Sequence, residues 1–230
     1  MITAAALCPA PPLLARELTG AVAVAPDLRQ ACLEAAGALL ADEPDLVAVV
    51  GVAAETRAWP SNGRLDLGGY APGLEAPTSA GPPVPLPLGL GARLLDHAGY
   101  DGRRELQSVG DDEPAWACAA LGGRLAGAAA RVALLVMADG SARRGLKAPG
   151  YLDERSAPFD AAVEAAVRAA DMAALLALDP VLARDLMATG RAGWQVLAGA
   201  MHRQQPVTKV RYCDDPFGVA YLVASLQPGG

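Results

Sequence analysis

Short apolar runs recur along the chain and alternate with segments in which apolar residues return every three or four positions. The runs at residues 2–7, 46–52 and 132–137 are rich in Val, Leu and Ala. Uninterrupted runs of this length are typical of strands buried on both faces, as in a parallel sheet. A weaker run at residues 105–109 predicts a further short strand.

The segments between these runs have helical periodicity. In residues 27–40 the apolar positions fall on one helix face, and Asp27, which follows Pro26, is the expected N-cap. Asp112 is the expected N-cap of a later helix that has Pro114 in its first turn. The predicted helices span residues 27–40, 88–98, 113–129, 158–169, 172–178, 180–187 and 191–201.

The chain closes with two apolar segments, residues 207–213 and 219–225, joined by a short polar turn that predicts an antiparallel hairpin. Residues 53–87 are interrupted by Gly, Pro, Ser and Asn, and the stretch 76–87 is expected to form no regular element. A loop of this length is usually functional, mobile or an insertion. The pattern predicts an α/β fold: a three-layer sandwich with a mixed, mainly parallel sheet, helices on both faces and a C-terminal antiparallel hairpin.

Composition narrows the class of protein. A chain of 230 residues suits a single domain, residues 1–230. The net charge of −6 and the absence of a basic block argue against nucleic-acid binding. No apolar run approaches the roughly 18 residues of a membrane span, and the N-terminus lacks the basic segment of a signal peptide. We therefore expect a cytoplasmic protein that does not bind membranes.

The cysteines support the same compartment. Cys8, Cys32, Cys118 and Cys213 are scattered and include no CxxC pair. In a chain of this size they are expected to be reduced thiols rather than a disulfide framework, and they predict no metal site.

Polar residues follow the apolar run at residues 132–137. Asp139, Ser141 and Arg143 come directly after it, and open α/β sheets bind ligands at the carboxyl ends of their strands. One interpretation is a ligand pocket formed by these side chains. The other is a strand-end turn in which Asp139 caps local backbone N–H groups.

Several stretches carry a family likeness, and they occur in order. Residues 8–14, CPAPPLL, resemble a P-H-P-P-L-[LI] turn, residues 45–55, DLVAVVGVAAE, a strand ending in S-P-H, and residues 138–144, ADGSARR, a G-D-L-S-H-R motif. Residues 159–180, 188–194 (ATGRAGW, for E-C-G-[LR]) and 216–224 resemble the helices and hairpin that follow. The chain thus resembles the LigB-like family, which comprises the catalytic subunits of class III extradiol ring-cleavage dioxygenases and their Memo relatives. The likeness covers most of the chain, with residues 53–87 as the main gap.

The family's chemistry uses a non-haem Fe(II) held by two His and one carboxylate, and a further His that acts as acid and base. This sequence departs from that pattern at each position. Ala10 stands where the first His is expected, Ala53 or Ala54 where the second is, Ala142 at the acid/base His, and Ala188 or Thr189 at the third ligand. An alanine methyl cannot coordinate iron, so no Fe(II) cofactor is expected.

The histidines of the chain lie outside these motifs. His97 and His202 each fall near the C-terminal end of a predicted helix, where an imidazole commonly serves as a surface group that compensates the helix dipole.

The resemblance therefore implies a protein that is not a dioxygenase and instead binds a small anionic or phenolic molecule or has a regulatory role. The candidate ligand-contacting residues are Cys8, Ala10, Ala53, Glu55, Asp139, Ser141, Ala142, Arg143 and Thr189. An alternative is an enzyme of altered chemistry that uses Asp139 and Ser141, with or without Glu55 and with or without a hard divalent cation such as Mg²⁺ or Mn²⁺. A third is a structural protein whose old cleft is filled. Because relatives often associate and the closing hairpin offers a sheet edge, a homodimer is the expected assembly.

Some of these residues also have structural interpretations. Arg143, Arg144 and Lys147 form either a basic pocket wall or solvated loop charges. Thr189 is the expected N-cap of the helix at residues 191–201. Cys8 is either a soft metal ligand or a buried small apolar residue.

Overall fold

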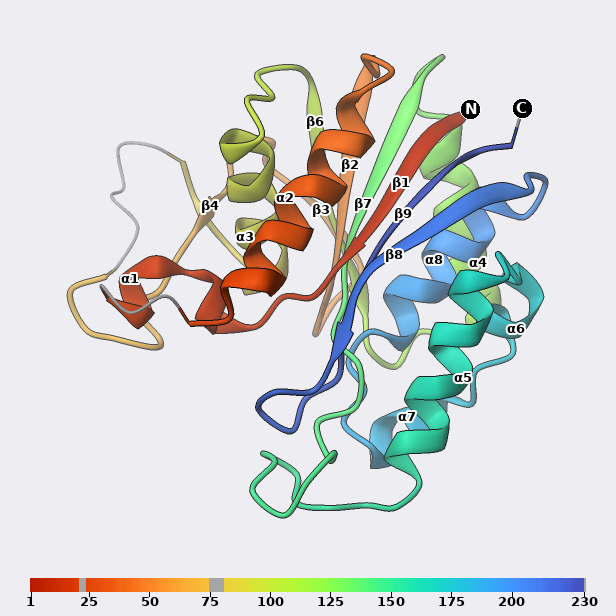
Figure 1. The fold of residues 1–230 in the computed structure, drawn as a ribbon. Coiled ribbons are helices and arrows are strands. Elements are labelled where there is room, and N and C mark those ends of the chain that lie inside the picture. Colours follow the sequence, from red (N-terminus) through yellow and green to blue (C-terminus); the bar gives the residue numbers. More distant parts are fainter. Residues whose placement is uncertain (21–23, 75–80, 230) are drawn as a thin grey trace.

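A seven-stranded sheet organises the computed structural model, which describes residues 1–20, 24–74 and 81–229. The strand order is β3-β6-β2-β7-β1-β9-β8 (Figure 1). These strands are β1 (Ile2–Cys8), β2 (Leu46–Ala53), β3 (Arg57–Trp59), β6 (Arg104–Gly110), β7 (Val132–Met137), β8 (Pro206–Asp214) and β9 (Tyr221–Pro228). β6, β2, β7 and β1 run parallel, while β3, on β6, and β9, on β1, are antiparallel to their neighbours.

Helices cover both faces of this sheet (Figure 1). α2 (Pro26–Leu40) and α3 (Leu86–His97) pack on one face. The other face carries α4 (Ala115–Ala126), α5 (Ser156–Arg168), α6 (Met172–Leu176), α7 (Pro180–Asp185) and α8 (Arg191–Met201). The predicted three-layer α/β fold, with its C-terminal antiparallel hairpin of β8 and β9, is confirmed.

The central strand shows why an unbroken apolar run was needed. All six residues of β7 are buried, because the strand has a neighbour on each side and helices on each face. Val136 belongs to the core under α8, whereas Met137 belongs to the core under α2 and α3. Residues beyond the end of β7 therefore leave the sheet between two helical layers.

The N-caps predicted for three helices are wrong. α2 begins at Pro26 and α4 follows Pro114, so Asp27 lies in a first turn and Asp112 lies outside its helix. Pro26 fixes the backbone angle that a first turn needs, whereas Pro114 occupies the N-cap position of α4 rather than its first turn, where it was predicted. Neither helix has a side-chain cap. At α8 the N-cap position is Gly190 rather than Thr189, and the backbone N–H of Gly190 donates to the carbonyl of Asp139.

Residues 53–87 are more regular than their composition predicts. β3 pairs with β6, and the short strands β4 (Arg64–Leu65) and β5 (Pro83–Val84) form a separate parallel pair. α3 then begins at Leu86, so the expectation of no regular element was wrong for residues 83–87, while residues 76–80 lie outside the described residues. The buried side chains of Leu65 and Val84 explain the order, because they add apolar contacts that a Gly and Pro count does not reveal.

α4 and α8 pack with unusually little space between their backbones. A Cβ placed on Gly199 would lie 2.3 Å from the carbonyl oxygen of Ala119, and one on Gly122 would lie 2.1 Å from the carbonyl oxygen of Val196. Glycine is thus required at both positions of this contact. Within the described residues, no helix is long and apolar enough to cross a membrane.

Candidate functional site

Asp139 follows β7 at the carboxyl edge of the sheet, and it joins two strands rather than capping its own turn. Its Oδ1 accepts a hydrogen bond of 2.8 Å from the backbone N–H of Ala10, which follows β1. The backbone N–H of Ala138 donates to the carbonyl of Cys8 at 2.8 Å, so the two strand ends are tied twice. Burial raises the pKa of Asp139 to about 6, although the bond from Ala10 acts in the opposite direction.

Ser141 faces a different partner. Its hydroxyl donates to Oδ2 of Asp160 at 2.5 Å, and its backbone N–H donates to Oδ1 of the same carboxylate at 2.9 Å. Burial raises the pKa of Asp160, an effect that the two bonds from Ser141 oppose. Asp160 lies in α5 and was not among the predicted site residues; nothing in the sequence distinguished it from Glu164, the other acid of the same helix.

The basic residues of this segment form ion pairs. Arg143 donates to the carbonyl of Asp185 at 2.8 Å and lies 3.8 Å from Asp153. Arg144 lies 2.7 Å from Asp215 and 3.8 Å from Asp160. Lys147 is exposed. The two arginines therefore hold the loop that follows β7 to its neighbours.

The other predicted ligand-contacting residues include both buried and exposed side chains. Cys8, Ala10 and Ala142 are buried, and Ala53 is partly buried at the end of β2. Glu55 and Thr189 are exposed. The structure thus brings Cys8, Ala10 and Asp139 together and joins Ser141 to Asp160.

The donor set at this edge does not fit an extradiol iron site. Ala10, Ala53, Ala142 and Ala188 offer no ligand atoms in their side chains. Among residues 1–20, 24–74 and 81–229, no group of three or more His, Cys, Asp or Glu side chains is placed to hold a metal ion.

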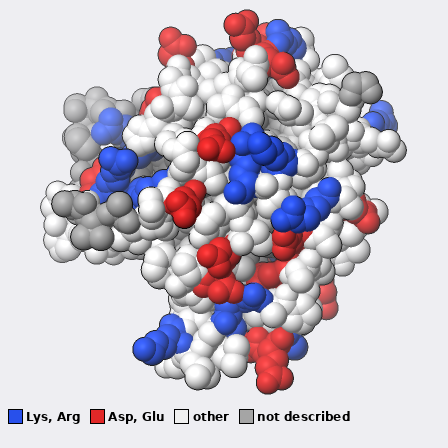
Figure 2. All heavy atoms as spheres, viewed as in Figure 1, with Lys and Arg blue, Asp and Glu red and all other residues white. Residues whose placement is uncertain are grey.

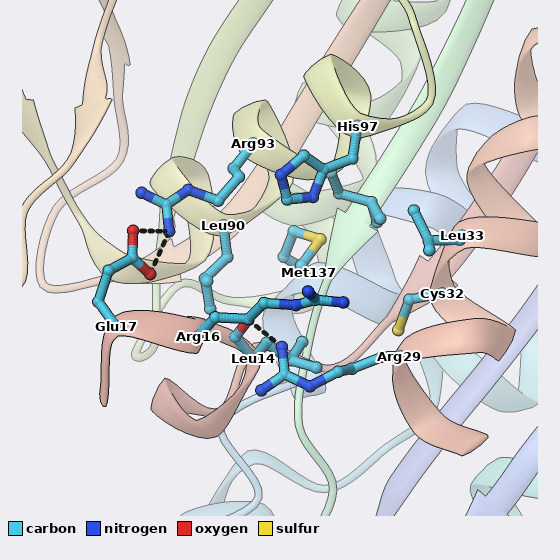
Figure 3. A pocket seen from close by; sticks show the side chains of 11 residues that line it. Leu14, Arg16, Glu17, Arg29, Cys32, Leu33, Leu90, Arg93, His97 and Met137 are labelled. Carbon is cyan, nitrogen blue, oxygen red and sulfur yellow. Dashed lines mark hydrogen bonds and ion pairs between the residues drawn. The ribbon is translucent and has the colours of Figure 1, made fainter. Parts of the chain in front are cut away.

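A cavity of about 670 Å³ lies on the face of the sheet that carries α2 and α3. It is formed between η1 (Pro12–Leu14), α1 (Arg16–Thr19), α2 and α3. Figure 3 shows the side chains that line it, which come from these elements and, for Met137, from the end of β7. Its lining is Leu14, Arg16, Glu17, Arg29, Cys32, Leu33, Leu90, Arg93, Leu94, His97 and Met137. This size falls within the usual range of small-molecule sites, roughly 300–1,000 Å³.

Two of the three arginines in the cavity already have partners. Arg93 binds both carboxylate oxygens of Glu17 at 2.7 Å (Figure 3). Burial would raise the pKa of Glu17, but hydrogen bonds from its own backbone and from Arg93 hold it below its ordinary value. Arg29 donates to the backbone carbonyls of Leu13 and Leu14 and so fixes the turn after β1.

Arg16 differs from both. No hydrogen bond or ion pair of its side chain is found among the described residues. Its guanidinium reaches across the cavity and lies between Met137 and Arg29 in the view of Figure 3. Burial and the nearby charge of Arg16 lower the pKa of Arg29, and the opposing effects of Cys32 and Glu17 are smaller.

One wall of the cavity is formed by a thiol. Cys32, in α2, lines the cavity. Hydrogen bonding with the Cys32 thiol and burial hold the pKa of Cys8, at the end of β1, well above its ordinary value. Cys8 is thus a buried thiol directly behind the cavity wall.

Sequence reasoning missed this cavity, although a signal for it was present. Leu90, Arg93, Leu94 and His97 follow helical spacing, which places an arginine and a histidine on an otherwise apolar helix face. The interpretation of His97 as a surface group was incomplete: the side chain is exposed, near the end of α3, and it also lines the cavity.

Comparison with solved structures finds a protein of the same overall fold. The chain is similar to the crystal structure of the uncharacterized protein JW3007 from Escherichia coli K12, with a TM-score of 0.59 and 14% sequence identity. The alignment covers 99% of this chain and 100% of that one. The likeness is one of fold. No protein-family model and no curated protein matches the chain.

The visible surface adds one electrostatic fact. On the face drawn in Figure 2, acidic and basic side chains are interspersed and form no extended area of one sign.

Proposed function

We propose that this chain is a LigB-like protein without extradiol iron chemistry, and that it binds a small molecule in the cavity between α1, α2 and α3. The observation that carries the proposal is the cavity itself. It combines an apolar floor with a few convergent polar groups, the usual composition of a small-molecule site.

The family assignment is supported by the order of the motifs and by the fold. CPAPPLL follows β1, ADGSARR follows β7, and the closing hairpin lies where the family pattern has one. At the same time Ala10 and Ala142 stand at positions where that pattern has histidines. The Asp139 that accompanies them accepts a backbone hydrogen bond from Ala10, which is a structural task.

The alternative, an altered enzyme built on Asp139 and Ser141, has weaker support. Ser141 is fully buried and its hydroxyl is bonded to Asp160, so a substrate could not reach it without displacing that contact. Glu55 is exposed at the end of another strand. Asp139 and Ser141 therefore form hydrogen bonds with different partners, Ala10 and Asp160.

The test has two parts. Purified protein is loaded anaerobically with Fe(II) and supplied with a catechol, and oxygen uptake is followed; we expect no uptake above that of iron in buffer. The protein is then screened by thermal shift against a mixed set of small carboxylic acids, phenols and neutral compounds, and we expect some to stabilise it. Catechol-dependent uptake, or a screen without any stabilising compound, would contradict the proposal.

A further inference from the structure

The charge inside the cavity is not balanced. Glu17 neutralises Arg93 through two hydrogen bonds, which leaves the guanidinium groups of Arg16 and Arg29 without an acidic partner among the described residues. Arg29 donates to neutral carbonyls and to a threonine hydroxyl, so its positive charge persists. An anion in the cavity would relieve the repulsion between these two groups.

The two arginines differ in what they can offer such an anion. Arg29 donates hydrogen bonds from Nε and from both terminal nitrogens to the segments on either side of α1 and to the end of α1 itself. Its positive charge is therefore held in a fixed position. Arg16 retains all its N–H donors, so it can bind a carboxylate through two parallel hydrogen bonds. A planar two-oxygen head group matches this fork.

Apart from these charged groups and the exposed imidazole of His97, the lining is apolar and contains no Phe, Tyr or Trp. Leu14, Leu33, Leu90, Leu94, Cys32 and Met137 surround the remaining volume. Flexible aliphatic walls suit a flexible aliphatic body, whereas a small inorganic anion would leave this surface without a partner.

We infer that the ligand is an aliphatic monocarboxylate whose carboxylate binds Arg16 beside Arg29 and whose chain lies against Met137 and the leucines of α2 and α3. This inference rests on the proposed function, since it specifies the ligand class of the same cavity. Arg16 gives the cavity its specificity for a carboxylate, and the apolar lining gives it its specificity for an aliphatic chain.

The experiment is a calorimetric titration of the full chain with octanoate, and with octanamide as a neutral compound of the same shape. We expect octanoate to bind at least about tenfold more tightly, because a hydrogen bond to a charged group contributes more than a neutral one. Arg16→Gln is expected to reduce octanoate binding by a similar factor and to leave octanamide unchanged. Arg103→Gln is the matched control, since Arg103 is also exposed and no partner of its side chain is found within the described ranges.

The outcomes separate this inference from the proposed function. Equal binding of octanoate and octanamide overturns the inference and leaves a small-molecule site in place. Inorganic phosphate that binds as tightly as octanoate overturns the aliphatic body. If Arg103→Gln weakens octanoate binding as much as Arg16→Gln does, the head-group assignment is wrong. If no compound of the thermal-shift screen binds either, both proposals fail.

Discussion

The carboxylate of Asp139 accepts a hydrogen bond from the backbone N–H of Ala10, 2.8 Å away, although 129 positions separate the two residues in the sequence. This bond ties the ends of the two adjacent parallel strands β1 and β7. It also places the one retained acid of the ADGSARR motif in a structural role. The burial of this carboxylate also disfavours its ionised form.

The pH dependence of stability tests this environment. The pKa of Asp139 is raised from 3.8 to about 6, mainly by burial. Between these values the folded state binds more protons than the unfolded state, so stability falls as pH rises from about 4 to 6 and the loss is complete above that window. This group's contribution is up to about 3 kcal/mol.

Asp139→Asn removes the titration while keeping an oxygen that can accept from Ala10. Urea unfolding at pH 4 and pH 7 should therefore show a smaller drop in stability for this variant than for the unmodified protein. Asp42→Asn, at an exposed position, is the control and should retain the full drop. An unchanged drop in Asp139→Asn would mean that the carboxyl group ionises freely.

The contact between Ser141 and Asp160 is expected to stabilise the loop after β7. Ser141→Ala removes both a hydroxyl and a bond to a largely buried carboxylate, and should cost about 1–3 kcal/mol in the free energy of unfolding. Ser61→Ala, in an exposed turn, should change it by less than about 0.5 kcal/mol. Similar small effects at both positions would show that the contact contributes little.

The close approach of α4 and α8 predicts opposite outcomes for one substitution at two helical glycines. Gly199→Ala directs a methyl group at the backbone of Ala119 and should destabilise the protein by several kcal/mol, about 3 or more. At Gly37 in α2 a Cβ meets nothing within 4 Å, so Gly37→Ala should stabilise by up to about 1 kcal/mol. Thermal unfolding of the two variants measures the difference, and a stable Gly199→Ala protein would exclude the tight contact.

Thiol labelling tests the placement of the cysteines. Cys213 is exposed, whereas Cys8, Cys32 and Cys118 are buried. Burial and hydrogen bonding to Glu164 raise the pKa of Cys213 to about 11, so we expect one slow reaction whose rate increases with pH in the alkaline range. Cys213→Ser should abolish this reaction in the native protein, and a second thiol reacting at the same rate would contradict the buried positions of the other three.

Much of the fold could be predicted because most of its strands and helices have a recognisable pattern within their own stretch of sequence. The apolar run at residues 132–137 predicted β7 with its bounds unchanged, since a central strand needs an apolar residue at every position. The closing hairpin was also predicted, although β9 begins at Tyr221 rather than at residue 219. The predicted N-caps were wrong because α2 begins at Pro26, one residue before Asp27, and because Pro114 rather than Asp112 precedes α4.

Apart from the polar positions on the apolar face of α3, the cavity had no signal in the sequence, because it depends on which elements pack together. The side chains of Arg16, Arg29 and His97 come from three separate helices, and no spacing along the chain relates them. The partner of Ser141 was hidden for the same reason, since Asp160 is supplied by α5. The family resemblance singled out residues that follow the strands, whereas the cavity lies on the face of the sheet that carries α2 and α3.

The most direct measurement is the ¹³C-methyl spectrum of the methionines while a small molecule is added. The chain has five methionines, and Met137 forms part of the cavity lining, whereas Met172 and Met201 are buried on the other face of the sheet. Octanoate, 4-ethylphenol and octanamide are titrated in turn. The account predicts that at least one of them shifts the Met137 signal saturably and leaves Met172 and Met201 in place. A spectrum that none of them changes, or shifts confined to the other methionines, would contradict it.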